Sequence, residues 1–530
     1  MDELDTSLKS VNLSKPQSPI KQILALATLG ACLLLGGLGT FLFNNSFHAS
    51  YKFWGLNIAI FGLALAISLL ILRRLGQRPL SFTGYVLIIS GLFFTITLAW
   101  RDSLVLNALS LLGILLTINL AFGLGTRRKL QPIYVSETLF DLSWSIKYGI
   151  NSYHHLINQD IKWHEVQKRW GGVGHAIFRG LVITIPLFVV FALLFIASDA
   201  RFENMVNSLL NWGWEPNTIY QNILIFILSS WIVAAILRGA VLKQGLTPNQ
   251  NYPRLPTWSL GTVEIVMLLG TLNILFLVFI AVQFSYFFGG DALVQSLYGP
   301  TYSNYARRGF FQLVIVAILA ITLLLMIHWA HKPLRRLGKK LFLWLAVIMV
   351  ILTMIIEASA AHRMYLYTNV YGLTELRFYT SVFMGWVIVL FGWFSVTVLR
   401  GQRAYFSFGA VLTGMIFIGS LHFVNPDAQI AAVNLERLQD GQRFDHVYLA
   451  SLSADAIPTL YAALDDIPKS KNRCENLWRE LKSHRVLQPD DNWPYLNLSR
   501  YKAPIFNWRY LNLSRYKARK LLAASESKCR

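Results

Sequence analysis

Charged residues are scarce in this chain of 530 residues, at 14%, whereas a typical soluble domain holds about 25%. Acidic residues are the scarcest, because 27 Asp and Glu stand against 48 Lys and Arg, for a net charge of +21. Three cysteines are too few to hold such a chain together by disulfides. Hydrophobic residues make up 55%, which excludes an ordinary soluble protein. A basic excess on so apolar a chain indicates a membrane protein with basic loops rather than a nucleic-acid-binding protein.

The chain also lacks the short motifs that mark common enzyme sites. It has no GxxxxGKS/T phosphate loop, no GxSxG nucleophile turn, no HExxH zinc motif and no glycine-rich dinucleotide fingerprint. We therefore predict no catalytic, cofactor-binding or metal-binding residues. Membrane enzymes often use scattered acids and histidines, so this absence weakens an enzymatic interpretation without removing it.

Long apolar runs dominate what is present. A membrane-spanning helix needs about 20 mostly apolar residues to cross about 30 Å of hydrocarbon. Because the runs are continuous rather than alternating, they predict helices and not barrel strands. We expect an all-α protein, a polytopic transmembrane helix bundle of about 11 spans with a small soluble helical C-terminal module. The eleven runs are 22–43, 53–72, 80–100, 103–124, 176–198, 218–237, 259–286, 309–330, 341–362, 378–399 and 404–424.

Lysine and arginine set the expected orientation of these spans. If the N-terminus is cytoplasmic, the cytoplasmic segments hold 23 Lys and Arg and the outside loops hold seven. This asymmetry is the positive-inside pattern. With eleven spans it places the C-terminal tail outside the cell, whereas a miscount of one span would reverse that side.

The loops divide the chain into five expected parts. The amphipathic linker contains His154, His155, His164 and Glu165, but their spacing matches no established zinc pattern. Helices lying on the membrane surface are therefore favoured over a metal site there. The parts are a cytoplasmic N-terminal tail (1–21), a four-span membrane portion (22–124), the cytoplasmic linker (125–175), a seven-span membrane portion (176–424) and a soluble helical tail (425–530).

Charged residues inside spans are costly and usually face protein or water. Glu264 lies at a depth close to those of Arg179 and Arg238, towards the cytoplasmic side. We expect an intramembrane ion pair between Glu264 and Arg179 or Arg238, because pairing lowers the cost of burying either charge. Such a pair serves either as a staple of the bundle or in transport.

A second polar cluster is expected near the outer face, where two carboxylates and four arginines share a similar depth. Arginine offers a planar fork to phosphate or carboxylate, so the cluster is typical of an anion or lipid-headgroup site. A salt-bridge network that locks the loop between spans nine and ten is the alternative. The members are Arg307, Arg308, Glu357, His362, Arg363, Glu375 and Arg377.

The tail ends in an internal repeat. NWPYLNLSRYKA at 492–503 recurs as NWRYLNLSRYKA at 507–518, differing only at Pro494 and Arg509. This is the pattern of a tandem duplication, and its basic and aromatic residues fit either anionic headgroups or docking on the module. Cys474 and Cys529 form a disulfide in an oxidising compartment or remain two free thiols.

Several blocks of the sequence resemble a bacterial membrane protein family of unknown function (domain of unknown function, family forty-one seventy-three). The resemblance covers roughly 175–520 and implies a bacterial multi-pass membrane protein with a soluble tail, but no activity. The blocks are YGLTELRFY (371–379), YARRGFF (305–311), NPDAQIAAVNLER (425–437), YLASLSADAIPTL (448–460) and the NLSRYKA end.

Three functions follow as expectations. The first is a structural or regulatory scaffold in a bacterial plasma membrane that presents the C-terminal helical module. The second is a transporter or lipid-handling permease that uses Glu264 and the outer cluster, and the third is a membrane-embedded transferase acting on a lipid-linked substrate. The expected partners are the lipid bilayer and an anionic lipid or protein at the tail, with no nucleic acid and no cofactor.

Overall fold

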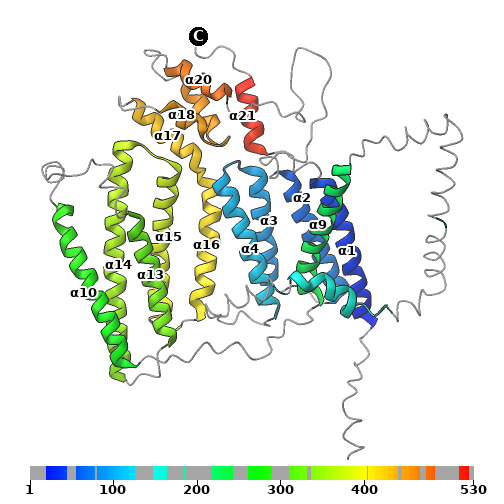
Figure 1. The fold of residues 1–530 in the computed structure, drawn as a ribbon, viewed down its shortest axis with the longest axis horizontal. Coiled ribbons are helices and arrows are strands. Elements are labelled where there is room, and N and C mark those ends of the chain that lie inside the picture. The colour runs from blue at the N-terminus through cyan, green and yellow to red at the C-terminus, as the bar shows by residue number, and fades with distance from the viewer. Residues whose placement is uncertain are drawn as a thin grey trace, which may run out of the picture. The chain divides into compact units, whose positions relative to one another are not determined.

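A computed structural model of the protein describes residues 19–43, 55–77, 80, 82–126, 147, 149–163, 184, 216–242, 261–288, 310–330, 336–402, 404–439, 445–465, 473–483 and 512–523. All regular structure in these ranges is helical, which confirms the predicted all-α class (Figure 1). Helices satisfy their backbone hydrogen bonds internally, as segments this apolar require in a bilayer.

Ten of the eleven predicted spans coincide with a helix, and in the run at 176–198 only residue 184 is described. Among the described residues, seven helices are long and apolar enough to cross a membrane, and three shorter apolar helices accompany them. The protein is therefore an integral multi-pass membrane protein.

The chain divides into two compact units. Unit 1 comprises 1–92, 118–126 and 143–247, and unit 2 comprises 93–117, 127–142 and 248–530. These units follow spatial contacts rather than chain order. The five-part division of the sequence therefore stays a prediction.

Unit 1 is built on α1 (Pro19–Phe43), α2 (Leu56–Leu75) and α9 (Pro216–Leu242), with a short π-helix, η3 (Leu156–Asp160). Helices α1 and α9 approach closely, because a Cβ at Gly36 would lie 1.9 Å from the Ser230 hydroxyl and one at Gly39 would lie 2.4 Å from Ser229. Small residues of this kind let membrane helices pack backbone to backbone.

The membrane part of unit 2 contains the C-terminal part of α3 (Phe82–Trp100) and the N-terminal part of α4 (Leu104–Thr126). It also contains α10 (Thr262–Phe288), α13 (Phe310–Ala330), α14 (Arg336–Tyr371), α15 (Glu375–Thr397) and α16 (Ala404–Val424). Helix α14 has 36 residues, or about 54 Å at 1.5 Å per residue, which exceeds the hydrocarbon thickness. It therefore continues beyond the apolar layer at one end at least.

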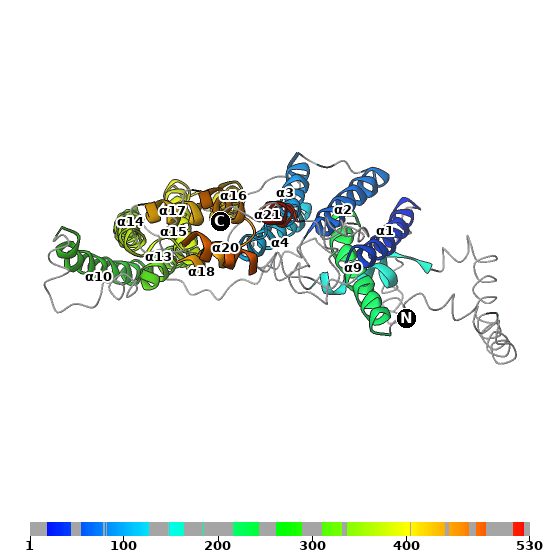
Figure 2. The same cartoon turned by 90° about the horizontal axis from the view of Figure 1, so that it is seen from above.

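The described tail is a small helical module within unit 2. It consists of α17 (Pro426–Gln439), α18 (His446–Ser451), α19 (Ile457–Ala462), the 3-10 turn η4 (Ala463–Asp465), α20 (Arg473–Ser483) and α21 (Leu513–Ala523). Its core includes Leu460, Leu477 and Leu522, and Leu373 and Phe378 from the α14–α15 region pack against that core. The module therefore lies at the end of the unit 2 bundle where α14 ends and α15 begins (Figures 1 and 2).

Candidate functional site: the junction of bundle and tail

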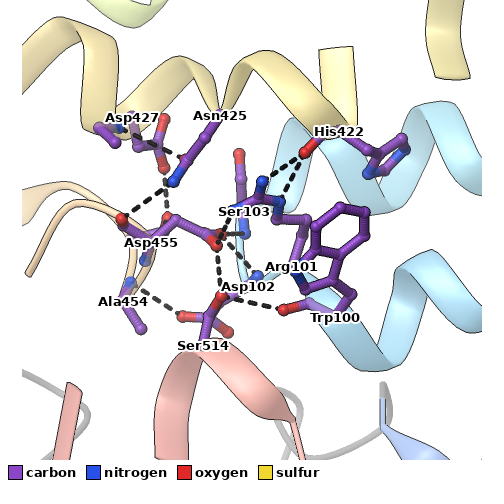
Figure 3. Close-up of polar contacts among 12 residues, drawn as sticks. Trp100, Arg101, Asp102, Ser103, His422, Asn425, Asp427, Ala454, Asp455 and Ser514 are labelled. Atoms are coloured by element: carbon purple, nitrogen blue, oxygen red, sulfur yellow. Dashed lines mark hydrogen bonds and ion pairs between the residues drawn. The ribbon is translucent and has the colours of Figure 1, made fainter. Parts of the chain in front are cut away.

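The turn between α3 and α4 is three residues long, and all three are buried although they are polar. They are Arg101, Asp102 and Ser103. Such a turn leaves carbonyls without partners at the end of α3 and N–H groups without partners at the start of α4. Buried polar groups are costly unless they are hydrogen-bonded, and the C-terminal tail supplies the partners here (Figure 3).

Asp455 is the main acceptor at this turn. Its carboxylate accepts the backbone N–H of Asp102 at 2.7 Å and of Ser103 at 3.0 Å. The negative charge thus lies at the N-terminus of α4, where the helix dipole favours an anion. The same carboxylate pairs with Nη1 of Arg101 at 3.3 Å and accepts a hydrogen bond from the Ser514 hydroxyl. One buried carboxylate therefore satisfies donors from both the bundle and the tail.

Arg101 connects the turn with the end of α16. Its Nε donates to the carbonyl oxygen of His422 at 2.8 Å, and its Nη2 donates to the same oxygen. The last carbonyls of a helix have no partner within it, so the guanidinium satisfies one of them. The guanidinium also lies 4.5 Å from the centroid of the Trp100 ring, within the range of cation–π attraction.

Helix α21 satisfies the carbonyls at the end of α3. Nδ2 of Asn512 donates to the carbonyl oxygens of Leu98 at 3.3 Å and Arg101 at 2.7 Å. The Ser514 hydroxyl also lies 2.9 Å from the carbonyl oxygen of Trp100, which competes with Asp455 for its single proton. The start of α21 therefore caps a helix that is more than 400 residues away in the sequence.

Asp102 is a bundle carboxylate that accepts from the tail, as Asp455 is a tail carboxylate that accepts from the bundle. Its carboxylate accepts the backbone N–H of Ala454 at 3.2 Å and pairs with Nε of Arg515 at 2.5 Å. The two arginines and two aspartates balance in charge, which is the condition under which buried charges are tolerated. We call Arg101, Asp102, Ser103, Asp455, Ser514 and Arg515 the junction cluster.

Another carboxyl group, that of Asp427, lies beside the junction cluster on the first turn of α17. The Ser453 hydroxyl donates to Asp427 and also lies 3.3 Å from Oδ2 of Asp455. A hydroxyl has a single proton, so it cannot donate to both acids at once. Burial and the carboxylates of Glu375 and Asp455 raise the pKa of Asp427, and the Ser453 hydrogen bond lowers it, for a net pKa of about 7. Asp427 therefore changes its protonation near neutral pH.

The turn between α14 and α15 forms a second joint between bundle and tail. Gly372 has a φ of +79°, and a Cβ there would lie 2.3 Å from Oδ1 of Asn434, so the position requires glycine. Asn434 holds Leu373 by both backbone groups, accepting its N–H at 3.1 Å and donating to its carbonyl oxygen at 2.7 Å. Arg437 donates to the carbonyl oxygen of Val370, near the end of α14, at 3.0 Å.

Two residues of the predicted outer cluster, Glu375 and Arg377, lie at this second joint. The backbone N–H of Glu375 donates to the Tyr448 hydroxyl at 2.8 Å, and burial raises the pKa of that phenol to about 12. Arg377 donates to the carbonyl oxygen of Tyr371 at 3.2 Å, and its guanidinium lies 4.0 Å from the Tyr367 ring centroid. Both residues therefore contact the backbone and rings of the joint.

The structure does not bring Glu357 together with these two residues. Glu357 lies 14 residues before Tyr371 on α14, or about 21 Å along the helix axis. His362 and Arg363 lie between these positions on the same helix. Arg307 and Arg308 lie outside the described residues.

The predicted intramembrane ion pair stays a prediction. Arg238 of α9 forms a buried ion pair at 2.6 Å with Asp160 of η3, a partner other than the predicted Glu264. Glu264 is exposed in the first turn of α10, and its carboxylate turns back towards Gly261. Arg179 lies outside the described residues.

A family model described as Domain of unknown function (DUF4153) matches residues 88–463. The chain belongs to this family. The predicted family number, forty-one seventy-three, was wrong, whereas the prediction of a family of unknown function is confirmed. No curated protein and no solved structure gives a significant match. The DUF4153 match includes the 101–103 turn, Asp427 and the 453–455 segment, and it ends before α21.

Sequence reasoning missed the junction cluster, although two signals pointed to it. Arg101 to Ser103 form a polar turn between two long apolar runs, and so short a turn leaves helix ends that need partners. The duplicated NLSR segment marks the tail residues that supply them, Asn512, Ser514 and Arg515. Within the DUF4153 match, the blocks that carried the resemblance also meet at the two joints, because Gly372 contacts Asn434 and Ser453 contacts Asp427.

Proposed function

We propose that the protein is a scaffold in a bacterial plasma membrane that holds its C-terminal helical module in a fixed position on the outer side. The observation that carries this proposal is that the buried polar groups of the junction cluster form hydrogen bonds and ion pairs with one another. Its two carboxylates accept backbone N–H groups and guanidiniums from within the junction. Groups engaged in this way lock two parts of a protein together and are not free to react with a substrate.

Two observations support the outer placement of the module. The 101–103 turn, the α14–α15 turn and the tail meet at one end of unit 2, as the positive-inside assignment requires. Cys474 is buried in the module and is disulfide-bonded, whereas Cys32 is a free thiol. Structural disulfides persist in oxidising compartments outside the cytoplasm.

Membrane-impermeant maleimide tests the side in spheroplasts. Val447 on the module and Arg400 at the opposite end of unit 2 are both exposed, so V447C and R400C are matched reporters in a background without the native cysteines. We expect V447C to be labelled in intact spheroplasts and R400C only after permeabilisation. The reverse pattern would overturn the outer placement.

Spin-label distance measurements test the fixed position. Labels at V447C and at Y365C on α14, both exposed positions, report the distance between module and bundle in the full-length protein. A scaffold gives one narrow distance distribution in the wild type and a broad one in a D455N variant. A broad distribution in both proteins contradicts the proposal, and a narrow one in both contradicts the role of the junction cluster.

One observation favours the transport alternative. Glu357 is 1% exposed, and among the described residues neither of its carboxylate oxygens has a hydrogen-bond partner. Ionisable residues buried at membrane depth commonly mark ion or proton pathways. Dicyclohexylcarbodiimide attacks protonated carboxyls in apolar surroundings and leaves an acylurea of known mass. Modification of Glu357 that is absent in E357Q would support proton-coupled transport, and an unmodified Glu357 would argue against it.

A further inference from the structure

The contacts that α21 makes with the α3–α4 turn and with Asp455 come from residues 512–515 at the start of that helix. Asn512 caps the carbonyls of the α3 end, Ser514 bonds Asp455, and Arg515 pairs with Asp102. Ala518, one turn further along α21, is fully buried in the module core. The motif that binds is therefore Asn-Leu-Ser-Arg followed by a buried alanine.

The chain contains this motif twice. The earlier copy lies fifteen residues before the second in the sequence. Its residues that correspond to the four contact residues are Asn497, Ser499, Arg500 and Ala503. The one difference between the copies, Pro494 in place of Arg509, falls three residues before the first contact residue. We propose that the first copy, 497–503, is a second ligand for the same site and replaces the second copy, 512–518, when the contacts of that copy are lost.

The first copy has the charge and the reach that this exchange requires. Arg500 has the same guanidinium group as Arg515, which pairs with Asp102 in the structure. Thirteen residues connect the end of α20 at Ser483 to Asn497, and an extended chain of that length spans about 40 Å. A module of about 100 residues has a radius of gyration of about 13 Å, so the first copy can reach the site from α20.

The second copy is nevertheless the stronger ligand, which agrees with its place in the structure. Helix α21 continues to Ala523 and buries Leu522. In the first copy the residue after Ala503 is Pro504, which does not fit a helix interior, and Asn507 stands where Leu522 would be. Loss of one buried leucine corresponds to about 10- to 100-fold in affinity. The first copy is therefore a weaker substitute.

A double-mutant cycle in the full-length protein tests the exchange. The readout is hydrogen exchange of the Asp102 and Ser103 amides, which are bonded to Asp455 in the docked state. We expect R500A to exchange like the wild type, R515A to exchange about 10- to 100-fold faster, and the double variant to exchange at least a further tenfold faster than R515A. If the double variant and R515A exchange equally fast, the first copy does not bind and the proposal fails.

Two controls keep the result interpretable. Lys517 is exposed on α21 and is also duplicated, so K517A should leave the exchange rate unchanged. A synthetic peptide of residues 492–503 added to the double variant should restore protection, whereas the same peptide with Arg500→Ala should not. If R515A fails to fold while K517A folds, or if both peptides act alike, the first copy is not a ligand for this site. None of these outcomes depends on the scaffold role.

Discussion

Substitution of Asp455 by asparagine tests whether the junction cluster holds the tail on the bundle. The two side chains have the same shape, so the change removes one charge and turns one acceptor oxygen into a donor. Oδ2 of Asp455 faces two backbone N–H groups, and Oδ1 faces Arg101 and Ser514. In one orientation the amide NH2 group faces the two backbone N–H groups, and in the other it faces the Arg101 guanidinium. Either orientation removes the negative charge opposite Arg101 and places an N–H donor against another donor.

The expected loss is large because the affected groups are buried. Removing one partner of a buried ion pair costs about 3–5 kcal/mol, and a hydrogen bond to a charged group contributes about 1.5–3 kcal/mol. These values describe the same carboxylate and do not add. We therefore expect D455N to lower the free energy of opening of the module by about 3–5 kcal/mol, or roughly 10²- to 10⁴-fold in the opening equilibrium.

Native-state hydrogen exchange of the module amides measures this opening directly. Asp445 provides a matched control, because it is exposed and its carboxylate accepts the N–H of Tyr448 at the start of α18. Asparagine is as good an N-cap as aspartate, so D445N should exchange like the wild type. If D455N also exchanges like the wild type, the junction cluster does not hold the module and the reasoning is refuted.

Three further changes have defined outcomes. The pKa of Asp427 is raised on folding to about 7. The stability that Asp427 contributes to the folded module therefore falls as the pH rises from about 4 to 7, by up to about 4 kcal/mol. D427N should remove this pH dependence of the unfolding free energy, measured by chemical unfolding of the module. G372A should destabilise the second joint by about 2–4 kcal/mol, because it combines a positive φ with loss of the Asn434 contact. Asn425 has a φ of +56°, so N425A should cost about 2 kcal/mol and N425G less, measured as shifts in the urea midpoint.

The membrane helices could be predicted from the sequence because their signal is local. Each run of about 20 apolar residues carries its own reason to be helical, and ten of the eleven runs coincide with helices. The NPDA segment likewise marks the start of α17, where Pro426 and Asp427 suit a helix N-terminus. Information of this kind does not depend on which distant residues lie nearby.

The candidate site could not be predicted because its partners are far apart in the sequence. Asp102 pairs with Arg515 across 413 residues and Arg101 with Asp455 across 354. Grouping charges by depth placed Glu357 with Glu375, yet α14 continues for 14 residues past Glu357, or about 21 Å, before the turn that leads to Glu375. Depth limits which residues share a layer of the membrane, but it does not choose partners within that layer.

Charge balance adds to the effect of burial on the pKa of Asp427. The junction cluster has two guanidiniums and two carboxylates, each engaged in an ion pair. Asp427 adds a third carboxylate that has no cationic partner among these ion pairs, and its side chain is bonded to Ser453. When Asp427 is protonated it can donate to Ser453, which frees the serine proton for Asp455 and leaves the junction neutral. When Asp427 ionises, Ser453 must bond one of two acids and the junction carries an excess negative charge. The attachment of the tail should therefore be tighter below pH 7 than above it.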